Sequence, residues 1–342
     1  MEHRPLGRTG VSVSKLCLGA MMLGDWGTKD HDESIGIIHR ALDAGINFID
    51  TADIYSQGES EVIVGKAVAG AKRDDVVLAS KVHMPMGEDP NRRGNSRRWI
   101  IREVEDSLQR LGTDWIDLYQ IHRHDPDIDI DETLGALTDL VRAGKIRYLG
   151  SSTFPAHQIV EAQWIAERRG RERFVCEQPP YSILTRGVEV DVLPTCARYG
   201  MGVIPYSPLA GGWLSGRYRK GSELAAPASA ARRRLANRFD MSLSANQRKL
   251  DAVEQLAEVA QEAGMTLIEM AIAFVLRHPA VTSVIIGPRT MEHLESQLTA
   301  ADVELSDDVL DRIDQIVPPG TTINPADGGW VSPALQTAAR RR

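Results

Sequence analysis

Eight short runs rich in Val, Ile and Leu recur along the chain, separated by longer segments with helical periodicity. Strands that are buried on both faces have such continuous apolar runs, as in parallel sheets covered by helices. One unbroken series of eight strand–helix units favours an α/β fold closed as a (β/α)8 TIM barrel over an open doubly wound sheet. The predicted strands are Leu16–Gly19, Asn47–Asp50, Val76–Lys81, Ile116–Ile121, Ile146–Ser151, Val175–Gln178, Gly202–Tyr206 and Ser283–Gly287.

The helical segments end at signals such as AGI, AGK and YGMG, where glycine suits a helix C-terminus. Residues 4–14 predict a β-hairpin that plugs the amino-terminal end of the barrel, and a long insertion, 207–245, follows the seventh strand. We expect a single domain over residues 1–320, followed by a tail, 321–342. The predicted helices are Asp32–Ala44, Ser96–Leu111, Thr133–Ala143, Pro155–Arg168 and Leu267–Arg277, with extra ones near the C-terminus at Ala245–Ala263 and Asp307–Val317.

Composition limits the class of protein. The 342 residues suffice for a barrel of about 250 residues with insertions. A net charge of −7 argues against a nucleic-acid partner, which needs a concentrated basic face. No apolar run approaches the ~18 residues that span a bilayer. Cys17, Cys176 and Cys196 are widely spaced and form no CxxC pair, as expected of buried thiols in a reducing compartment. We therefore expect a cytoplasmic protein without membrane contact.

Four residues of matched chemistry lie at or just past the ends of three successive predicted strands: Asp50, Tyr55, Lys81 and His122. The carboxyl ends of barrel strands meet at one mouth, which is where such barrels carry their sites. An ammonium close to a phenol lowers the pKa of the phenol, and a carboxylate can hold the lysine. Each residue also has a plainer interpretation, as a packing aromatic, a buried salt bridge or a hydrogen-bonded core histidine. Together they predict a phenolic general acid at the mouth.

Several phrases, in order, resemble the aldo-keto reductases over residues 4–317: LGRTGVSVSKLCLG, AGINFIDTADIYSQGESE, VVLASK, SLQRLGTDWIDLYQIH, AGKIRYLGSS, EQPPYSIL, YSPLAGGWLSGRY and VIIGPRTMEHLESQL. The resemblance implies reduction of a small-molecule carbonyl compound by NADPH, with NADH as the other candidate. It implies a cofactor held without a Rossmann domain, and no GxGxxG follows a predicted strand. It also implies that Tyr55 donates the proton, that Lys81 and Asp50 tune the phenol, and that His122 orients the carbonyl group.

The resemblance further assigns residues to the nicotinamide half of the cofactor. Ser152 and Gln178 match the partners of the carboxamide, whose polar atoms their side chains can bind. Thr153 stands where Asn or Arg is commoner. Tyr206 matches the aromatic residue that stacks on the nicotinamide ring. The remaining matches on this side include the residues expected to line the nicotinamide ribose and the pyrophosphate. They are Gly19, Ala20, Met21, Asp50, Ser207, Leu209 and Gly211.

The adenosine half is matched by a second group near the end of the barrel. Gly287 precedes a predicted helix that starts near Thr290, and a helix N-terminus suits a phosphate. Arg289 matches the partner of the 2′-phosphate that distinguishes NADP from NAD. His293 and Gln297 replace residues that are more often Gln or Arg and Asn, so NAD stays a candidate. Arg217 in the insertion is either a further phosphate partner or one of many solvated arginines.

Aromatic residues in loops predict an apolar mouth around Tyr55. We expect substrate contacts from Trp26, His83 and Trp213, with Met84 and Trp330 as weaker candidates. The tail 321–342 is expected to cover part of this pocket.

Two other functions compete with a reductase. One is a cofactor-binding regulatory subunit similar to the potassium-channel beta subunits, which tend to lose the histidine that is present here as His122. The other is a metal-dependent hydrolase that uses Asp50, His122 and His124. Such sites usually draw His and carboxylate ligands from several strands, which this sequence does not offer.

Overall fold

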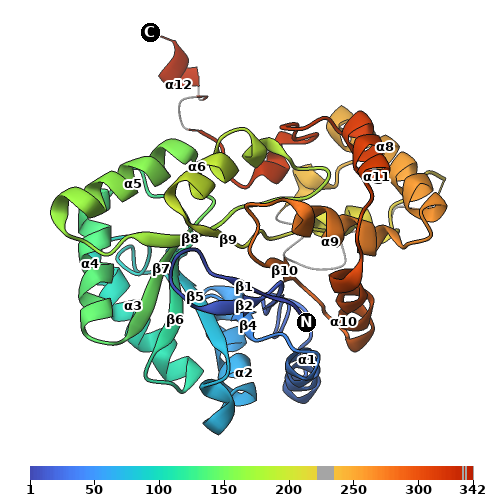
Figure 1. The fold of residues 1–342 in the computed structure, drawn as a ribbon. Helices are drawn as coiled ribbons and strands as arrows, with labels where there is room; N and C mark the ends of the chain where they lie inside the picture. The colour runs from blue at the N-terminus through green and yellow to red at the C-terminus, as the bar shows by residue number, and fades with distance from the viewer. Residues whose placement is uncertain (222–234, 333–334, 336, 342) are drawn as a thin grey trace.

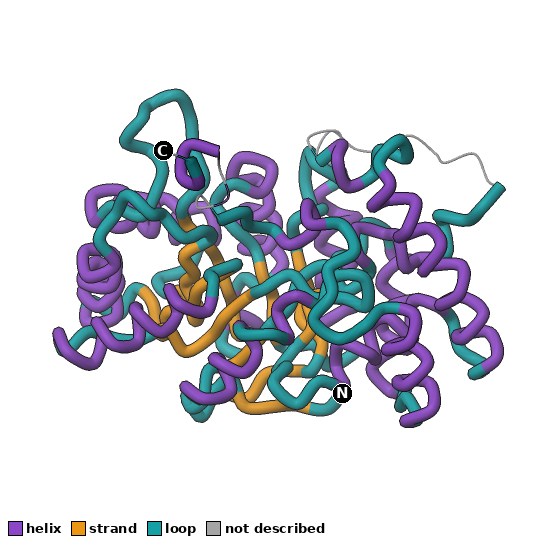
Figure 2. Tube along the Cα trace, turned by 90° about the horizontal axis from the view of Figure 1, so that it is seen from above, coloured by secondary structure: helices purple, strands orange, loops and turns teal. Residues whose placement is uncertain are grey.

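The apolar runs of the sequence form the eight parallel strands of one sheet, which neighbour one another in chain order. The computed structural model describes residues 1–221, 235–332, 335 and 337–341. The strands stand at the centre, and the helices surround them (Figures 1 and 2). The barrel strands are β3 (Leu16–Gly19), β4 (Phe48–Asp50), β5 (Val77–Val82), β6 (Ile116–Ile121), β7 (Ile146–Ser152), β8 (Phe174–Gln178), β9 (Gly202–Val203) and β10 (Val284–Ile286).

Hydrogen bonds between the two outermost strands close the sheet into a barrel. The N–H of Thr282 donates to the carbonyl oxygen of Val203 at 2.8 Å, and that of Ile285 donates to Pro205 at 2.9 Å. The predicted (β/α)8 barrel is therefore confirmed. The predicted strand Gly202–Tyr206 was too long, because Pro205 has no N–H to give to a ladder. An isolated bridge between Pro180 and Tyr206 continues the contact past the strand.

Helices follow the strands and bury their apolar faces against them, with polar caps at several ends. Asp30 accepts hydrogen bonds from the first turn of α1, and Thr266 and Glu269 form a capping box on α9. The helices are α1 (His31–Asp43), α2 (Glu59–Ala67), α3 (Arg97–Leu111), α4 (Ile130–Arg142), α5 (Ala156–Arg169), α6 (Val192–Tyr199), α8 (Ser244–Glu262), α9 (Leu267–Arg277), α10 (Met291–Leu298), α11 (Asp307–Ile316) and α12 (Thr337–Arg340).

The predicted hairpin is present and plugs the amino-terminal end of the barrel. It pairs β1 (His3–Pro5) with β2 (Ser12–Ser14) in antiparallel register. Leu6 and Val13, both fully buried, pack on an apolar layer inside the barrel. The barrel residues of this layer are Cys17, Phe48, Ala79, Leu118, Cys176, Ile204 and Ile285.

The C-terminal part of the chain returns to the barrel after α11. Thr322 bridges to Thr185, and the buried ammonium of Lys249 on α8 lies 2.8 Å from a carboxylate oxygen of Asp327. Beyond residue 332, the short helix α12 projects away from the body of the molecule (Figure 1). Residues 222–234 of the insertion and residues 333, 334, 336 and 342 of the tail lie outside the described residues.

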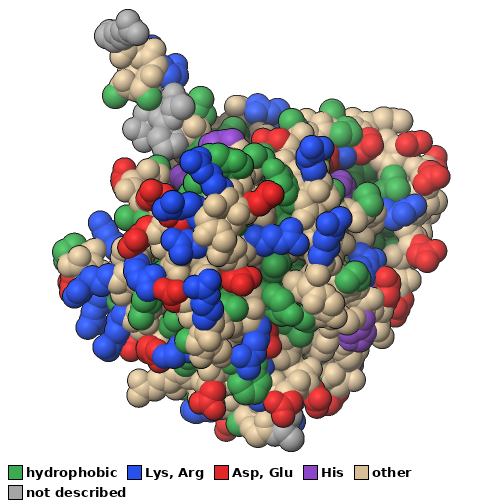
Figure 3. All heavy atoms as spheres, turned by 60° about the vertical axis from the view of Figure 1, so that its left-hand side comes forward, with side chains coloured by type: hydrophobic (Ala, Val, Ile, Leu, Met, Phe, Trp, Pro, Cys, Tyr) green, Lys and Arg blue, Asp and Glu red, His purple; other side chains and the backbone are tan. Residues whose placement is uncertain are grey.

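Charges of both signs are mixed on the face seen in Figure 3. Arg171 lies 2.9 Å from Asp131, and Arg97 pairs with Asp139. In the described part of the chain, no single helix has the length and apolar character to cross a membrane, although α8 and α9, bent by 93°, pass that test as a pair. Nor do the described residues bring together three His, Cys, Asp or Glu side chains that could hold a metal ion.

Candidate active site

The alternation of a β-strand places a polar layer directly above the apolar layer of the barrel. Side chains two positions apart point to the same side of a strand. The residues two positions after Phe48, Ala79, Leu118 and Cys176 are therefore also directed inward. All are polar, and all are nearly or completely inaccessible to solvent. They are Asp50, Lys81, Gln120 and Gln178.

A continuous hydrogen-bond network joins these four residues to the phenol of Tyr55. The ammonium of Lys81 lies 2.5 Å from Oδ1 of Asp50, donates to the carbonyl oxygen of Thr51 at 2.9 Å and donates to the Tyr55 hydroxyl at 3.2 Å. The other oxygen of Asp50 accepts from Gln120 at 3.0 Å and from Gln178 at 2.8 Å. The buried charges are thus paired, and the carboxylate is bound on both oxygens.

Tyr55 stands on a tight turn after β4. The two residues that follow it, Ser56 and Gln57, have φ angles of 49° and 56°, a conformation that is uncommon for residues other than glycine. Strained turns of this kind recur at functional sites, where the surrounding structure holds them. The turn brings the Tyr55 ring over Lys81, whose ammonium lies 4.8 Å from the ring centroid.

The ionisation of Tyr55 and Lys81 differs in part from the sequence-based expectation. Burial raises the pKa of Tyr55 above its usual value, and the charge of Lys81 only opposes that rise. For Lys81, burial favours the neutral amine, but Asp50 and Tyr55 together raise the pKa of the ammonium. At neutral pH the site therefore holds a protonated phenol beside a charged lysine, which is the arrangement of an acid.

His122 lies beside Tyr55 at the end of β6. Their ring centroids are 5.8 Å apart and their planes meet at 82°. Burial, together with the positive charges of Arg123 and Lys81, holds the pKa of His122 well below its usual value. Nδ1 of His122 is buried without a hydrogen-bond partner in the described structure. The imidazole is therefore neutral and offers one N–H donor next to the phenol.

The residues expected around the nicotinamide gather at the ends of β7, β8 and β9. The Ser152 hydroxyl donates to the carbonyl oxygen of Gln178 at 3.0 Å. Thr153 has a φ of 58° and lies 3.3 Å, oxygen to oxygen, from the Tyr206 hydroxyl. A Cβ on Gly329 would stand 2.5 Å from that hydroxyl, so the C-terminal segment lies against Tyr206.

The residues at the end of β3 and just after it differ in exposure. Gly19 is packed so closely that a Cβ would meet Ile285 at 2.7 Å, and Met21 is 42% exposed. Ala20 is fully buried, its N–H donates to Asp50, and its carbonyl oxygen accepts from Ser60. The backbone of Ala20 is therefore already engaged within the protein, and its expected cofactor contact stays a prediction.

The residues expected near the phosphates line an open part of the rim. Ser207, Gly211 and Arg217 are exposed, and Leu209 is partly exposed. Gly287 is also exposed, and among the described residues other than its chain neighbours no atom lies within 4 Å of a Cβ position. Beyond it, Thr290 caps α10. Of the other expected residues here, Arg289 and His293 are partly exposed, and Gln297 is buried.

The expected substrate residues fall into two groups. The ring centroids of Trp26 and Tyr55 are 6.1 Å apart. His83 follows Lys81 by two residues, and its Nδ1 lies 2.9 Å from Oδ1 of Asn95. Trp213 is fully buried, stacked on Tyr218 with centroids 4.4 Å apart. The insertion thus folds Trp213 inward in this arrangement, and its expected substrate contact stays a prediction.

Three residues at the site escaped the sequence analysis. Gln120 was detectable from strand alternation, since it is the polar inward position between Leu118 and His122. Glu177 is fully buried on the outer side of β8, where it accepts hydrogen bonds from Ser151 at 2.5 Å and from the Phe154 N–H at 3.1 Å. Arg123 follows His122 directly, but its direction could not be read from the sequence.

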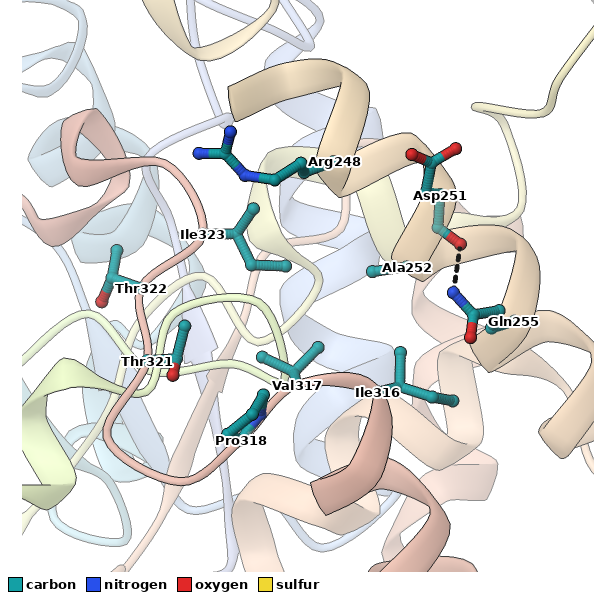
Figure 4. Close-up of a pocket in the computed structure, with 10 residues that line it drawn as sticks. All are labelled: Arg248, Asp251, Ala252, Gln255, Ile316, Val317, Pro318, Thr321, Thr322 and Ile323. Atoms are coloured by element: carbon teal, nitrogen blue, oxygen red, sulfur yellow. Dashed lines mark hydrogen bonds between the residues drawn. The ribbon is translucent and has the colours of Figure 1, made fainter. Parts of the chain in front are cut away.

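A separate surface pocket lies away from these residues, between α8 and the segment after α11 (Figure 4). None of the expected site residues lines it. Its walls are formed by Arg248, Asp251, Ala252, Gln255, Ile316, Val317, Pro318, Thr321, Thr322 and Ile323.

Comparison with known proteins places this geometry in a family. The model of the "Aldo/keto reductase family" matches residues 15–318. The chain belongs to the aldo/keto reductase family. It is 41% identical to the "Uncharacterized oxidoreductase YrpG" of Bacillus subtilis (strain 168) over 93% of this chain and 96% of that protein.

More distant relatives carry two kinds of name. The "Probable voltage-gated potassium channel subunit beta" of Oryza sativa subsp. japonica is 35% identical over 93% of this chain and 97% of its own length. The "Versiconal hemiacetal acetate reductase" of Aspergillus parasiticus is 32% identical over 92% and 96% respectively. Together with the family, the reductase and oxidoreductase names support an oxidoreductase that acts on a small molecule.

Proposed function

We propose that this protein reduces an aldehyde or ketone to the alcohol with NADPH, in a reversible reaction. For an aldehyde, R–CHO, NADPH and H⁺ give R–CH2OH and NADP⁺. The observation that carries the proposal is the chain of contacts from Asp50 through Lys81 to the protonated phenol of Tyr55, beside a neutral His122.

The residues at the rim fit a dinucleotide. Gly287 leaves open space, and Ser207 is exposed with a φ of 59°. Arg289 and Arg217 form no ion pair within the described part of the chain, so either guanidinium is free to bind a phosphate. This favours NADPH, whose 2′-phosphate Arg289 would bind, over NADH. When bound, the nicotinamide supplies the hydride.

The protein residues then supply orientation and a proton. The His122 N–H holds the carbonyl oxygen next to the Tyr55 hydroxyl. Tyr55 transfers its proton to that oxygen as negative charge develops on it. The Lys81 ammonium, held by Asp50, stabilises the phenolate that remains. Trp26 and His83 form the wall of the substrate pocket, with the tail from residue 321 as its cover near Tyr206.

The test measures both turnover and cofactor binding in a variant that lacks the hydroxyl oxygen of Tyr55. Tyr55→Phe removes the acidic hydroxyl and keeps the ring, so reduction of 4-nitrobenzaldehyde should fall by ~10²- to 10⁴-fold. NADPH binding, followed by quenching of tryptophan fluorescence, should change little. Tyr199→Phe, a matched change at the end of α6, should retain full turnover. Turnover that survives Tyr55→Phe would show that another group is the acid.

A cofactor-binding regulatory subunit is the second candidate, because relatives named as potassium-channel beta subunits match nearly the whole chain. This alternative predicts tight NADPH binding with very little turnover of any carbonyl compound. Single-turnover oxidation of bound NADPH by a panel of aldehydes, ketones and sugars distinguishes a reductase, which oxidises it, from a regulatory subunit, which does so very little.

A further inference from the structure

Arg123 stands on the rim of the candidate site without a role in the proposed mechanism. Its Nη1 donates to the carbonyl oxygen of His122 at 2.5 Å and reaches the Ser152 hydroxyl at 3.5 Å. These contacts fold the side chain across the carboxyl ends of β6 and β7, and the residue stays partly exposed. The guanidinium is therefore held at the mouth rather than free in solvent.

The charge of Arg123 has no partner within the described chain. No carboxylate there lies within ion-pair distance of it, and its remaining N–H groups donate to no described residue. The other cation of the site, Lys81, is already paired with Asp50. The nearby Glu177 is buried behind β8, and burial raises the pKa of its carboxyl to about 7, so it offsets the guanidinium only in part.

The electrostatic influence of Arg123 reaches the reacting groups. Its charge helps to lower the pKa of His122 and of His83, and it opposes the rise in the pKa of Tyr55. An anion bound at Arg123 would therefore stand close to a carbonyl group held between Tyr55 and His122. A guanidinium with free N–H groups matches a carboxylate in shape and charge.

We propose that Arg123 binds a carboxylate on the substrate, so that the site favours aldehydes or ketones that carry a carboxylate over their neutral counterparts. The inference rests on the proposed reductase function and narrows its substrate class. It makes Arg123 a specificity-determining residue: its contact with the carboxylate acts on substrate binding, whereas its charge acts on Tyr55 and His122 alike for acids and esters.

The experiment compares carboxybenzaldehydes with their methyl esters. The ester keeps the ring and the aldehyde, and it replaces the charged carboxylate by a neutral group with one added methyl. With NADPH, the wild-type protein should show a higher kcat/KM for at least one of the 2-, 3- or 4-carboxy isomers than for its ester, by about tenfold to a hundredfold. The preference should act mainly through KM, and it should fall as salt is added.

Variants identify the source of the preference. Arg123→Met should lower the acid-to-ester ratio at least tenfold, Arg123→Lys should keep part of it, and Arg93→Met, in the exposed loop near His83, should keep it whole. Cofactor affinity and the circular dichroism spectrum report on the fold of each variant.

Three results would overturn the inference. One is a wild-type protein that reduces no acid faster than its ester. Another is an Arg123→Met variant that slows acids and esters equally while weakening NADPH binding, which would place the guanidinium on the cofactor. If the wild type reduces neither acids nor esters with NADPH or NADH, the proposed function itself fails, and the inference with it.

Discussion

Replacing Glu177 by glutamine should change how the stability of this protein depends on pH. The Glu177 carboxyl is fully buried, and burial raises its pKa from 4.5 to about 7, against the opposing hydrogen bonds from Ser151 and the backbone. A glutamine fits the same space. Its carbonyl oxygen can accept from the Phe154 N–H and its amide can donate to the Ser151 hydroxyl, so only the ionisation is lost.

The sign and size of this change in the unfolding free energy follow from the coupling between proton binding and folding. The folded-state pKa is raised, so between pH 4.5 and about 7 the folded protein holds a proton that the unfolded chain has released. Wild-type stability therefore contains a contribution that is complete below pH 4.5 and is lost as the pH rises to about 7. From pH 5 to pH 8 the loss is about 2.5 kcal/mol, taking ~1.4 kcal/mol per pKa unit.

Urea unfolding at pH 5 and pH 8 measures this difference. Relative to wild type, Glu177→Gln should gain about 2.5 kcal/mol in unfolding free energy between the two pH values. Glu258→Gln, at an exposed position on α8, should follow the wild type at both. The pH dependence from other buried carboxyls, such as Glu103, is common to all three proteins and cancels. If the unfolding free energies of wild type and Glu177→Gln change equally between pH 5 and pH 8, the Glu177 carboxyl does not stay protonated up to about pH 7.

Three further predictions concern a buried ion pair, a close approach of two helices and a buried imidazole. Lys249→Met removes the closer, buried cation of Asp327 and leaves it Arg238 at 3.7 Å, and it should lower the unfolding free energy by about 3 kcal/mol. Lys220→Met breaks an ion pair that is more than half exposed and should change the unfolding free energy little; urea unfolding measures both. Gly65→Ala would place a Cβ 2.3 Å from a backbone oxygen of α3 and should lower the midpoint of thermal unfolding, while Gly36→Ala, with open space on α1, should leave it equal or higher. The imidazole of His122, assigned in NMR spectra by comparison with His122→Asn, should show no protonation step between pH 6 and 8, because burial and two nearby cations disfavour its charged form.

The sequence by itself determined the barrel and the place of its polar end. Runs of Val, Ile and Leu predict buried strands whatever their neighbours are, and the predicted ends of β3, β6 and α9 agree with the structure. Parallel strands must all end at the same mouth, so Asp50, Lys81 and His122 had to converge there. The other strand bounds differ by a residue at one or both ends, and β9 differs most, because the missing N–H of Pro205 ends the ladder early.

Tertiary structure alone decided which side chains meet and which are hidden. Closure of the barrel, not sequence distance, brings Gln178 to Asp50 across 128 positions of the chain. The insertion turns Trp213 into the core, where an apolar ring gains more from burial than from the rim. Arg123 bends across two strand ends, and burial rather than Lys81 sets the direction of the Tyr55 pKa shift. Local patterns determine which elements form, because hydrogen bonding and alternation act over a few residues. Burial and electrostatics depend on the whole packed molecule, and so only the fold determines them.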